Sequence, residues 1–134
     1  MAALDAQVDL RPDPAAPAAA RSFAATVLRG WDIPRQSIED VVLLVSEMVS
    51  NAVEHAGAAT PLRLTLRRGV RRLRVSVSDG SPIRPVLRRV DRHSLRGRGM
   101  HLVDRLADRW GTEEEAPGKR VWLEIDVPPA GGPA

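Results

Sequence analysis

The sequence lacks several residue types and patterns that would point to particular classes of protein. It has no cysteine among its 134 residues, which excludes disulfide bonds and thiolate metal sites. No apolar run approaches the length of a membrane span, and residues 1–14 lack the basic start and apolar stretch of a secretion signal. These absences predict a soluble protein of the cytoplasm that has no membrane partner.

Lysine and aromatic residues are also scarce. Lys119 is the only lysine, so arginine supplies the other basic side chains, and aromatic residues make up 3% of the chain. The net charge is +3 although the pI is about 10.8. We interpret the arginine bias as the mark of a GC-rich genome rather than of a function.

The residues that are present have the composition of a globular protein, with 43% apolar and 28% charged. A chain of 134 residues is long enough to bury roughly two thirds of its unfolded surface around one core. We therefore predict a single domain over residues 1–134, with a core from Val8 to Val127 and flexible termini.

Two helices are predicted in the first half, after a short strand at Val8–Leu10. Each is expected to begin at a capping side chain and to end before or at a glycine. These boundaries are Asp13, followed by Pro14, and Gly30 for the first helix, and Ser37 and Gly57 for the second, which runs through Ala56.

The apolar period changes to two between Leu62 and Asp79, where leucine and valine alternate with arginine, threonine and serine. This pattern predicts two strands joined by a turn at Gly69, and Val121–Val127 predicts a last strand. Strands that are apolar on one face and charged on the other belong to a sheet covered on one side. The predicted fold is α+β, a two-layer sandwich whose mixed, mostly antiparallel sheet carries helices on one face.

Between these strands, Gly80–Gly99 is rich in proline, glycine and arginine without periodicity, which predicts a long loop. Apolar residues at helical spacing then predict a third helix that ends at Gly111. Its apolar residues are Met100, Val103, Leu106, Ala107 and Trp110.

Arginines of the hairpin are expected on the open face of the sheet, near Glu124 and Asp126; they are Arg63, Arg67, Arg72 and Arg74. We interpret this face as solvated and partly self-neutralised. Direct contact with nucleic acid is disfavoured because side chains that stack on bases are scarce, with aromatic residues at 3%.

The segment "SEMVSNAVEHAG", residues 46–57, puts two polar side chains at the edge of an apolar helix face. At about 100° per residue, Glu47 and Asn51 lie about 40° apart and border the side of Met48 and Ala52. Spacing alone favours solvated side chains. A border of this kind is also where the wall of a pocket would lie.

Asp79 has the same parity as Leu73, Val75 and Val77, so it continues the inward face of its strand. Its carboxylate could cap the turn "SDGSP", a frequent role for Asp before Gly and Pro. It could equally accept a hydrogen bond from an amino group, such as the exocyclic amine of adenine.

Gly97 and Gly99 directly precede the third predicted helix, where free backbone N–H groups and the helix dipole favour an anion. A lone Gly-x-Gly is weak evidence for a phosphate-binding loop, and its context fits neither the Rossmann fingerprint nor the P-loop. The ordered set of an Asn/Glu helix, an inward Asp at a strand end and a basic loop closing with Gly-x-Gly describes a nucleotide pocket.

These segments carry a family resemblance. "SEMVSNAVEHAG", "VSVSDGSP" and "GRGMHLVDRLADRWG" with the later "GKRVW" resemble the N box and the two glycine boxes of the GHKL ATPase superfamily, which includes gyrase and histidine kinases. Within it, the chain resembles the stand-alone anti-sigma-factor serine/threonine kinases of GC-rich bacteria. The resemblance implies the histidine kinase-like ATPase fold, also called the Bergerat fold, with ATP and Mg²⁺ as cofactors.

The resemblance also implies roles for individual residues. Asn51 would ligate Mg²⁺ and contact the nucleotide, Glu47 would act as general base, and Asp79 would bind adenine. The lid-end residues near the phosphates would be Gly97, Arg98, Gly99 and Met100. The loop arginines could meet phosphates or a partner, or could belong to a mobile solvated loop; they are Arg84, Arg88, Arg89, Arg92, Arg96 and Arg98.

Two features depart from the wider superfamily. The sequence has "DGSPI" where many relatives have Asp-x-Gly-x-Gly, which indicates a different backbone approach to the nucleotide. No helical hairpin with a phospho-acceptor histidine precedes the domain, and His55, His93 and His101 lack metal-ligand spacing, so a complete sensor histidine kinase is not expected.

The favoured hypothesis is a regulatory kinase that binds Mg-ATP, sequesters a sigma factor and phosphorylates a serine of an anti-sigma antagonist. The alternative is a non-catalytic module of the same fold, in which nucleotide only stabilises a partner-binding shape. A third hypothesis is a basic nucleic-acid binder. Relatives of the favoured type commonly form homodimers.

Overall fold

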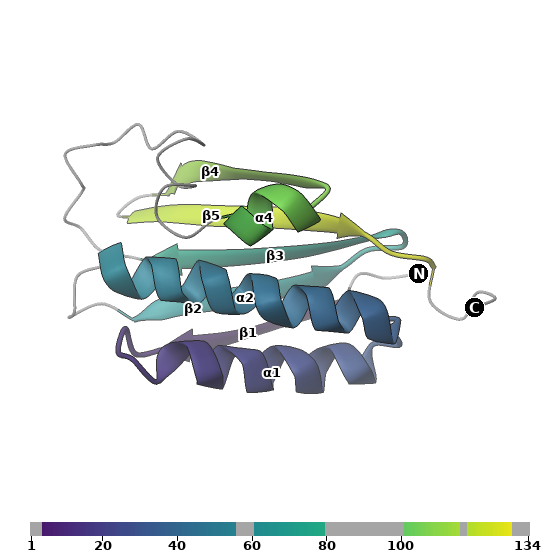
Figure 1. The fold of residues 1–134 in the computed structure, drawn as a ribbon, viewed down its shortest axis with the longest axis horizontal. Helices are drawn as coiled ribbons and strands as arrows, with labels where there is room; N and C mark the ends of the chain where they lie inside the picture. The colour runs from purple at the N-terminus through teal and green to yellow at the C-terminus, as the bar shows by residue number, and fades with distance from the viewer. Residues whose placement is uncertain (1–3, 56–60, 80–100, 116–117, 130–134) are drawn as a thin grey trace.

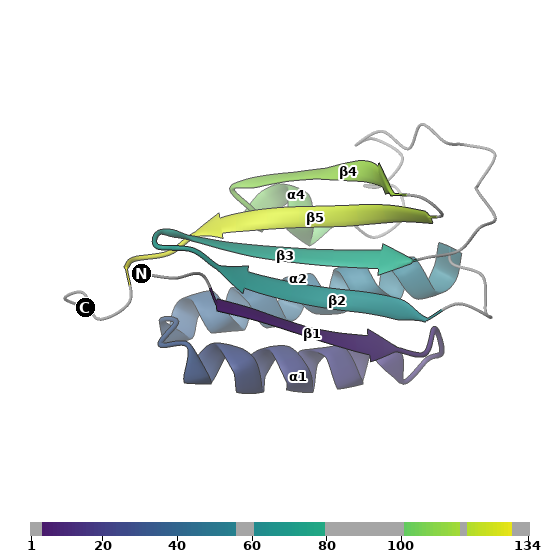
Figure 2. The ribbon, with the colours of Figure 1, turned by 180° about the vertical axis from the view of Figure 1, so that it is seen from behind.

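The computed structural model describes residues 4–55, 61–79, 101–115 and 118–129, which form a five-stranded antiparallel sheet with three helices on one face (Figure 1). The strands are β1 Leu4–Leu10, β2 Leu62–Arg68, β3 Arg72–Asp79, β4 Arg109–Glu115 and β5 Gly118–Asp126, and the helices are α1 Ala16–Gly30, α2 Arg35–His55 and α4 His101–Leu106. Figure 2 shows the sheet from the other side, where no described segment covers it. The predicted α+β sandwich is confirmed.

The strand order is β1-β2-β3-β5-β4, and every neighbouring pair among the described strands is antiparallel. The β2–β3 register pairs Leu62 with Asp79 and Leu66 with Val75. The β3–β5 register pairs Val77 with Val121. Residues of one parity therefore face the helices across the central strands, and Asp79 lies at the end of that row.

The core lies between this face of the sheet and the inner sides of α1 and α2. Small side chains on α1, Ala20 and Ala24, are fully buried, which lets the helix lie close to its neighbours. Burial of each Leu or Val side chain stabilises the fold by about 1.5–3 kcal/mol. The fully buried members from the other elements include Leu44, Val45, Val49, Leu64, Leu66, Leu73, Val75 and Leu123.

Both predicted helix starts are wrong, whereas the end of α1 at Gly30 is confirmed. The Asp13 carboxylate accepts a hydrogen bond from the Ala15 N–H at 2.9 Å, which closes a turn before α1, and Ala15 takes the cap position. In α2, the Ile38 N–H already donates to the Pro34 carbonyl at 3.0 Å, so the helix begins ahead of Ser37. The predicted stop at Ala56 and Gly57 lies outside the described residues.

The third predicted helix is wrong in its second half. The helix α4 ends at Leu106, and Trp110 belongs to the unexpected strand β4, where it pairs with Leu123. The Trp110 side chain is buried and donates from Nε1 to the Asp104 carboxylate at 3.1 Å. Trp110 packs into the same core as Val103 of α4, although it lies on a strand. Its spacing from the apolar residues of α4 along the sequence happens to match the helical period.

Gly111 does not stop a helix; it lies opposite Trp122 in the β4–β5 ladder. A Cβ at Gly111 would come within 3.1 Å of the Trp122 ring, so the glycine makes room for that ring. The predicted loop over residues 80–99 lies outside the described residues. Of the helices that the structure describes, none has the length and apolar character to span a membrane.

The open face of the sheet carries the predicted ion pairs. Arg72, Arg74 and Arg109 surround Glu124, at 3.7, 3.2 and 2.9 Å, and the Arg74 guanidinium also lies over the Trp122 ring. Arg63 and Arg67 pair instead with the β1 carboxylates Asp9 and Asp5, at 2.9 and 3.4 Å. This face is therefore extensively self-neutralised.

Candidate functional site

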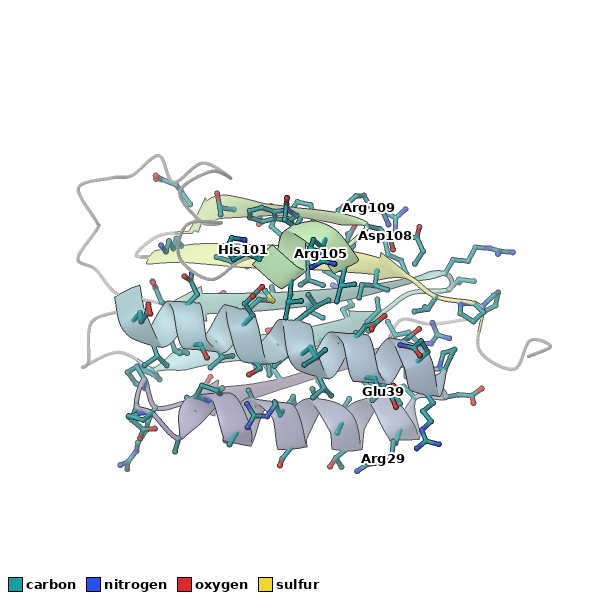
Figure 3. The ribbon with its side chains drawn as sticks, viewed as in Figure 1. Arg29, Glu39, His101, Arg105, Asp108 and Arg109 are labelled. Carbon is teal, nitrogen blue, oxygen red and sulfur yellow. The ribbon has the colours of Figure 1, made fainter. Side chains whose placement is uncertain are left out.

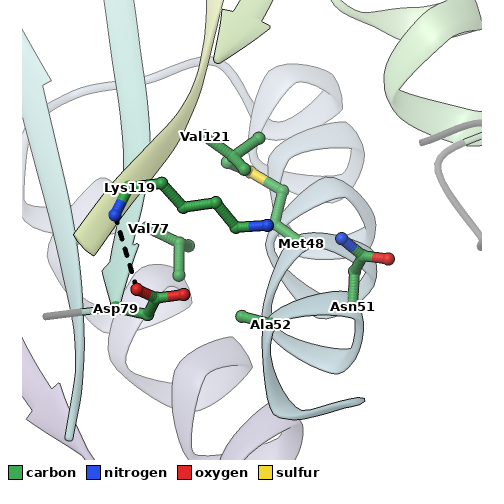
Figure 4. A pocket seen from close by; sticks show the side chains of 7 residues that line it. All are labelled: Met48, Asn51, Ala52, Val77, Asp79, Lys119 and Val121. Atoms are coloured by element: carbon green, nitrogen blue, oxygen red, sulfur yellow. Dashed lines mark hydrogen bonds between the residues drawn. The ribbon is translucent and has the colours of Figure 1, made fainter. Parts of the chain in front are cut away.

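A small pocket lies where α2 approaches the ends of β3 and β5 (Figure 4). Its lining consists of Met48, Asn51 and Ala52 from α2, Val77 and Asp79 from β3, and Lys119 and Val121 from β5. Two of the residues predicted from the sequence, Asn51 and Asp79, therefore share one cavity. They come from segments that are far apart in the chain and are brought together by packing of α2 on the sheet.

Asn51 is unusual because its polar side chain is buried, with an exposed fraction of 6%. Its Oδ1 atom has no hydrogen-bond partner among the described residues. An unsatisfied buried acceptor of this kind costs about 1–3 kcal/mol, so native proteins rarely keep one without a reason. A carboxamide oxygen is also a suitable ligand for Mg²⁺, which prefers oxygen donors.

One other buried side-chain atom, Nε of Arg68, lacks a partner among the described residues. The guanidinium of Arg68 is nevertheless held in place, because its terminal nitrogens donate to the carbonyls of Pro128 at 2.8 Å and Gly69 at 3.4 Å. Arg68 therefore has a structural explanation in the backbone that it holds, whereas the described residues supply none for the Asn51 oxygen.

Asp79 is positioned by the beginning of β5. Its Oδ1 atom accepts a long hydrogen bond from the Lys119 N–H, at 3.4 Å, and its exposed fraction is 9%. A Cβ at Gly118 would overlap the carbonyl and carboxylate oxygens of Asp79, so only glycine permits this approach. The sequence reading missed Gly118, although a glycine immediately before an alternating strand was a usable signal.

Glu47 does not line the pocket. Its Oε1 atom accepts a hydrogen bond from the Val103 N–H of α4 at 2.9 Å, and its side chain is half-buried. This amide is one of the N-terminal groups of α4 that have no partner inside the helix. Glu47 therefore connects α2 to the helix that begins directly after the predicted lid-end residues.

The four predicted lid-end residues, Gly97, Arg98, Gly99 and Met100, lie outside the described residues, as do the loop arginines and His93. The described residues contain no group of three or more His, Cys, Asp or Glu side chains that could hold a metal. Among the residues that line the pocket, Asn51 has a side-chain oxygen that could serve as a ligand for Mg²⁺, with nucleotide oxygens and water completing the shell.

Lys119 also lines the pocket, and the sequence reading did not assign it a role. Its parity matches Val121, Leu123 and Ile125, so extension of the β5 alternation by one step would have placed it inward. Figure 4 shows its side chain extending across the pocket toward α2. The cavity that remains is about 10 Å³, close to the space of one water molecule.

A larger hollow, about 550 Å³, lies at the corner between α1 and α2, where Figure 3 labels Arg29 and Glu39. Its charged side chains are exposed, and Arg35 and Glu39 form an ordinary surface ion pair at 3.6 Å. It lies near the start of α2, roughly 18 Å along the helix from Asn51 at 1.5 Å per residue. None of the predicted site residues lines this hollow, whereas Asn51 and Asp79 line the smaller pocket, which is therefore the better candidate for the nucleotide site.

Comparison with known proteins gives the following matches. A model of the histidine kinase-like ATPase domain matches residues 10–125. The fold is similar to the crystal structure of the RsbU and RsbW domains of Rv1364c from Mycobacterium tuberculosis, with a TM-score of 0.65, 19% identity and 95% of this chain covered. The matched region is 34% of that chain.

The fold is also similar to the catalytic domain of histidine kinase ThkA, with a TM-score of 0.57 and 14% identity. This match covers 94% of the present chain and 99% of the ThkA chain. At these identities the likenesses show the fold. A search of curated proteins gives no match.

Proposed function

The chain belongs to the family of histidine kinase-like ATPase domains, which bind ATP, and from this premise we propose that it is a Mg-ATP-dependent protein serine/threonine kinase acting as an anti-sigma factor. The observation that carries the nucleotide site is Asn51, which lines one pocket together with Asp79 and whose buried Oδ1 atom has no partner among the described residues. The resemblance of the N box and glycine boxes to anti-sigma kinases supports the protein substrate.

In this proposal, each end of the pocket recognises a different part of the nucleotide. The Asp79 carboxylate accepts a hydrogen bond from the exocyclic amine of adenine, because it is inward and buried at the sheet end, where the Lys119 N–H donates to it. Asn51 supplies an oxygen ligand for Mg²⁺, which neutralises phosphate charge when bound. The lid-end residues Gly97, Arg98, Gly99 and Met100 are proposed to contact the phosphates.

Glu47 is the proposed general base. It would take the proton of a serine hydroxyl on the antagonist protein as that oxygen attacks the γ-phosphate and ADP leaves. The Val103 N–H fixes one carboxylate oxygen at 2.9 Å, which would orient the other for this transfer. Positioning and charge neutralisation would supply most of the rate enhancement.

The same hydrogen bond supports a second candidate function, a nucleotide-binding interaction module without catalysis. The Glu47 carboxylate joins α2 to α4 and so has a structural role that needs no chemistry. In such a module, nucleotide would stabilise the arrangement of α4 and the neighbouring lid-end residues, and a partner would recognise that arrangement.

The proposed partners are a sigma factor and its antagonist, with homodimerisation of the chain as a further element of the proposal. A sigma-factor partner implies a cytoplasmic location. Direct contact with DNA is not part of the proposal, because the open-face arginines already have carboxylate partners on the sheet.

Co-purification and mass spectrometry identify candidate antagonists. Phosphoryl transfer from radiolabelled ATP to these candidates then tests the proposal. Glu47→Gln is the sharpest variant, because its amide oxygen can still accept the Val103 N–H but cannot take a proton. We expect it to lower transfer by about 100-fold or more while Mg-ATP binding is retained. Glu47→Ala, which removes both functions, is the matched variant and should also loosen α4.

Equal transfer by wild type and Glu47→Gln would contradict the assigned base. Absence of transfer to any co-purified partner, together with ATP-dependent capture of that partner, would establish the interaction module instead.

A further inference from the structure

Lys119 differs from the other cations of the sheet. Its ammonium has no hydrogen-bond or ion-pair partner among the residues that the structure describes, although it belongs to a strand rich in ion pairs. The described sheet arginines that pair with carboxylates are Arg63, Arg67, Arg72, Arg74, Arg109 and Arg120. The only lysine of the chain is thus a half-buried cation that forms no ion pair within the part of the chain that the structure describes.

The surroundings of Lys119 explain how it is held. Its side chain crosses the pocket from β5 toward α2 (Figure 4), and the lining there includes the apolar side chains of Met48, Val77 and Val121. These can cover the methylene stem while the charged head points toward the side of the pocket that carries Asn51. An ammonium that is partly removed from water and forms no ion pair is unfavourable, so an anionic ligand that reached the Lys119 ammonium would be stabilised.

We propose that Lys119 is the residue with which this pocket recognises the phosphate charge of its nucleotide. This proposal rests on the nucleotide site described above. A lysine ammonium is a compact point charge that suits phosphate oxygens. Asp79, at one end of the cavity, is suited to the neutral amine of a base, so the pocket contains separate groups for base and phosphate.

In this structure the Lys119 side chain extends across the pocket. At about 10 Å³ the cavity cannot hold a purine while the Lys119 side chain lies across it. Nucleotide entry therefore requires this side chain to move, and we expect the phosphate of an incoming nucleotide to stabilise its new position. Lys119 would in this way favour charged nucleotides over nucleosides.

The test compares affinities for Mg-ATP and adenosine by calorimetric titration. Lys119→Met keeps a flexible stem but removes the charge, and we expect it to lower Mg-ATP affinity about tenfold or more. Adenosine affinity should stay within about twofold of wild type. Arg120→Met is the matched control: it removes the same charge one residue away, on the open face where Arg120 pairs with Glu113, and should alter neither affinity.

Equal changes in Mg-ATP and adenosine affinity in Lys119→Met would overturn the inference, because they would indicate a space-filling role. An unchanged Mg-ATP affinity would do the same. Failure of the nucleotide site itself has another signature: wild type would not bind Mg-ATP, or Asn51→Ala would bind it as wild type does, and the Lys119 role would fall with it.

A second measurement needs no variant. Because Lys119 is the only lysine, reductive methylation with ¹³C introduces one side-chain signal for NMR, beside that of the N-terminal amine. Mg-ATP should shift this signal in proportion to binding, and adenosine at equal saturation should shift it much less. A Lys119 signal that responds equally to both ligands would refute the phosphate contact.

Discussion

The two faces of β3 and β5 treat polar groups in opposite ways. On the open face, Glu124 is surrounded by Arg72, Arg74 and Arg109, so each charge has a partner. On the helix side, the pocket between these strands and α2 is lined by Asn51 and Lys119, whose side-chain oxygen and ammonium lack partners among the described residues. The paired groups of the open face stabilise the fold, whereas the unpartnered groups of Asn51 and Lys119 share a pocket and make it the candidate ligand site.

The strongest way to break this comparison is Asn51→Ala. Mutation of the outer partners of metal sites alone costs about 10- to 100-fold in metal affinity, so loss of the ligand itself should lower Mg-ATP affinity by at least about 100-fold. The nucleotide-free protein should keep its free energy of unfolding or gain up to about 1 kcal/mol, because the variant removes an unsatisfied buried acceptor. Calorimetric titration and urea unfolding measure the two effects, and a loss of stability with unchanged affinity would reverse the assignment.

Gly118→Ala tests the close approach that positions Asp79. The added Cβ overlaps the Asp79 backbone, so β5 must shift, and we expect a loss of about 1–3 kcal/mol in the free energy of unfolding together with weaker ATP binding. Gly30→Ala is the control, because nothing lies within 4 Å of its Cβ position. Equal melting temperatures and ATP affinities for the two variants would show that the approach at Gly118 is dispensable.

Glu124→Gln is the counterpart on the open face. The carboxylate meets Arg109 at 2.9 Å and Arg74 at 3.2 Å, and its side chain is 12% exposed, so its loss should cost about 1–2 kcal/mol. Mg-ATP affinity should be unchanged, since Glu124 points away from the pocket. A decrease in affinity as large as that of Asn51→Ala would mean that the two faces are not independent.

The paired carboxylates of the open face also predict how the stability of the protein depends on pH. Burial raises the pKa of Glu124, but hydrogen bonds from Arg109 and Arg74 outweigh it and hold the pKa below its ordinary value of 4.5. The hydrogen bond from Arg63 likewise lowers the pKa of Asp9 below 3.8. A carboxylate with a lowered folded pKa stabilises the protein above its unfolded pKa, and this contribution is lost as pH falls through the folded pKa.

We therefore expect the free energy of unfolding to decrease as the pH falls below about 4.5, and Glu124→Gln to show a shallower decrease. Urea unfolding at a series of pH values from neutral to acid measures both slopes. Identical slopes would remove Glu124 from the explanation of acid sensitivity.

The sequence predicted those parts of the molecule that depend on local pattern. The β2–β3 hairpin follows from strict alternation, and the inward direction of Asp79 follows from its parity with Val75 and Val77. The existence of α2 follows from its helical apolar period, although its start depends on Pro34 rather than on Ser37.

The errors concern features that only the tertiary structure decides. The spacing of Trp110 fits the helical period and so predicts a place in the third helix, but its ring enters the core from β4. The sequence contains signals for Gly118 and Lys119, but the contact of both residues with Asp79 follows from the antiparallel pairing of β3 with β5. The roles of Glu47, Asn51 and Asp79 in nucleotide binding stay predictions.

Magnesium dependence of ATP binding tests the central assignment most directly, with calorimetric titrations of wild type and Asn51→Ala in the presence and absence of Mg²⁺. An oxygen ligand at Asn51 predicts that removal of Mg²⁺ weakens ATP binding by wild type strongly, and that Asn51→Ala binds ATP weakly and with little response to the ion. Equal affinities of wild type with and without Mg²⁺, or an undiminished magnesium response in Asn51→Ala, would contradict it.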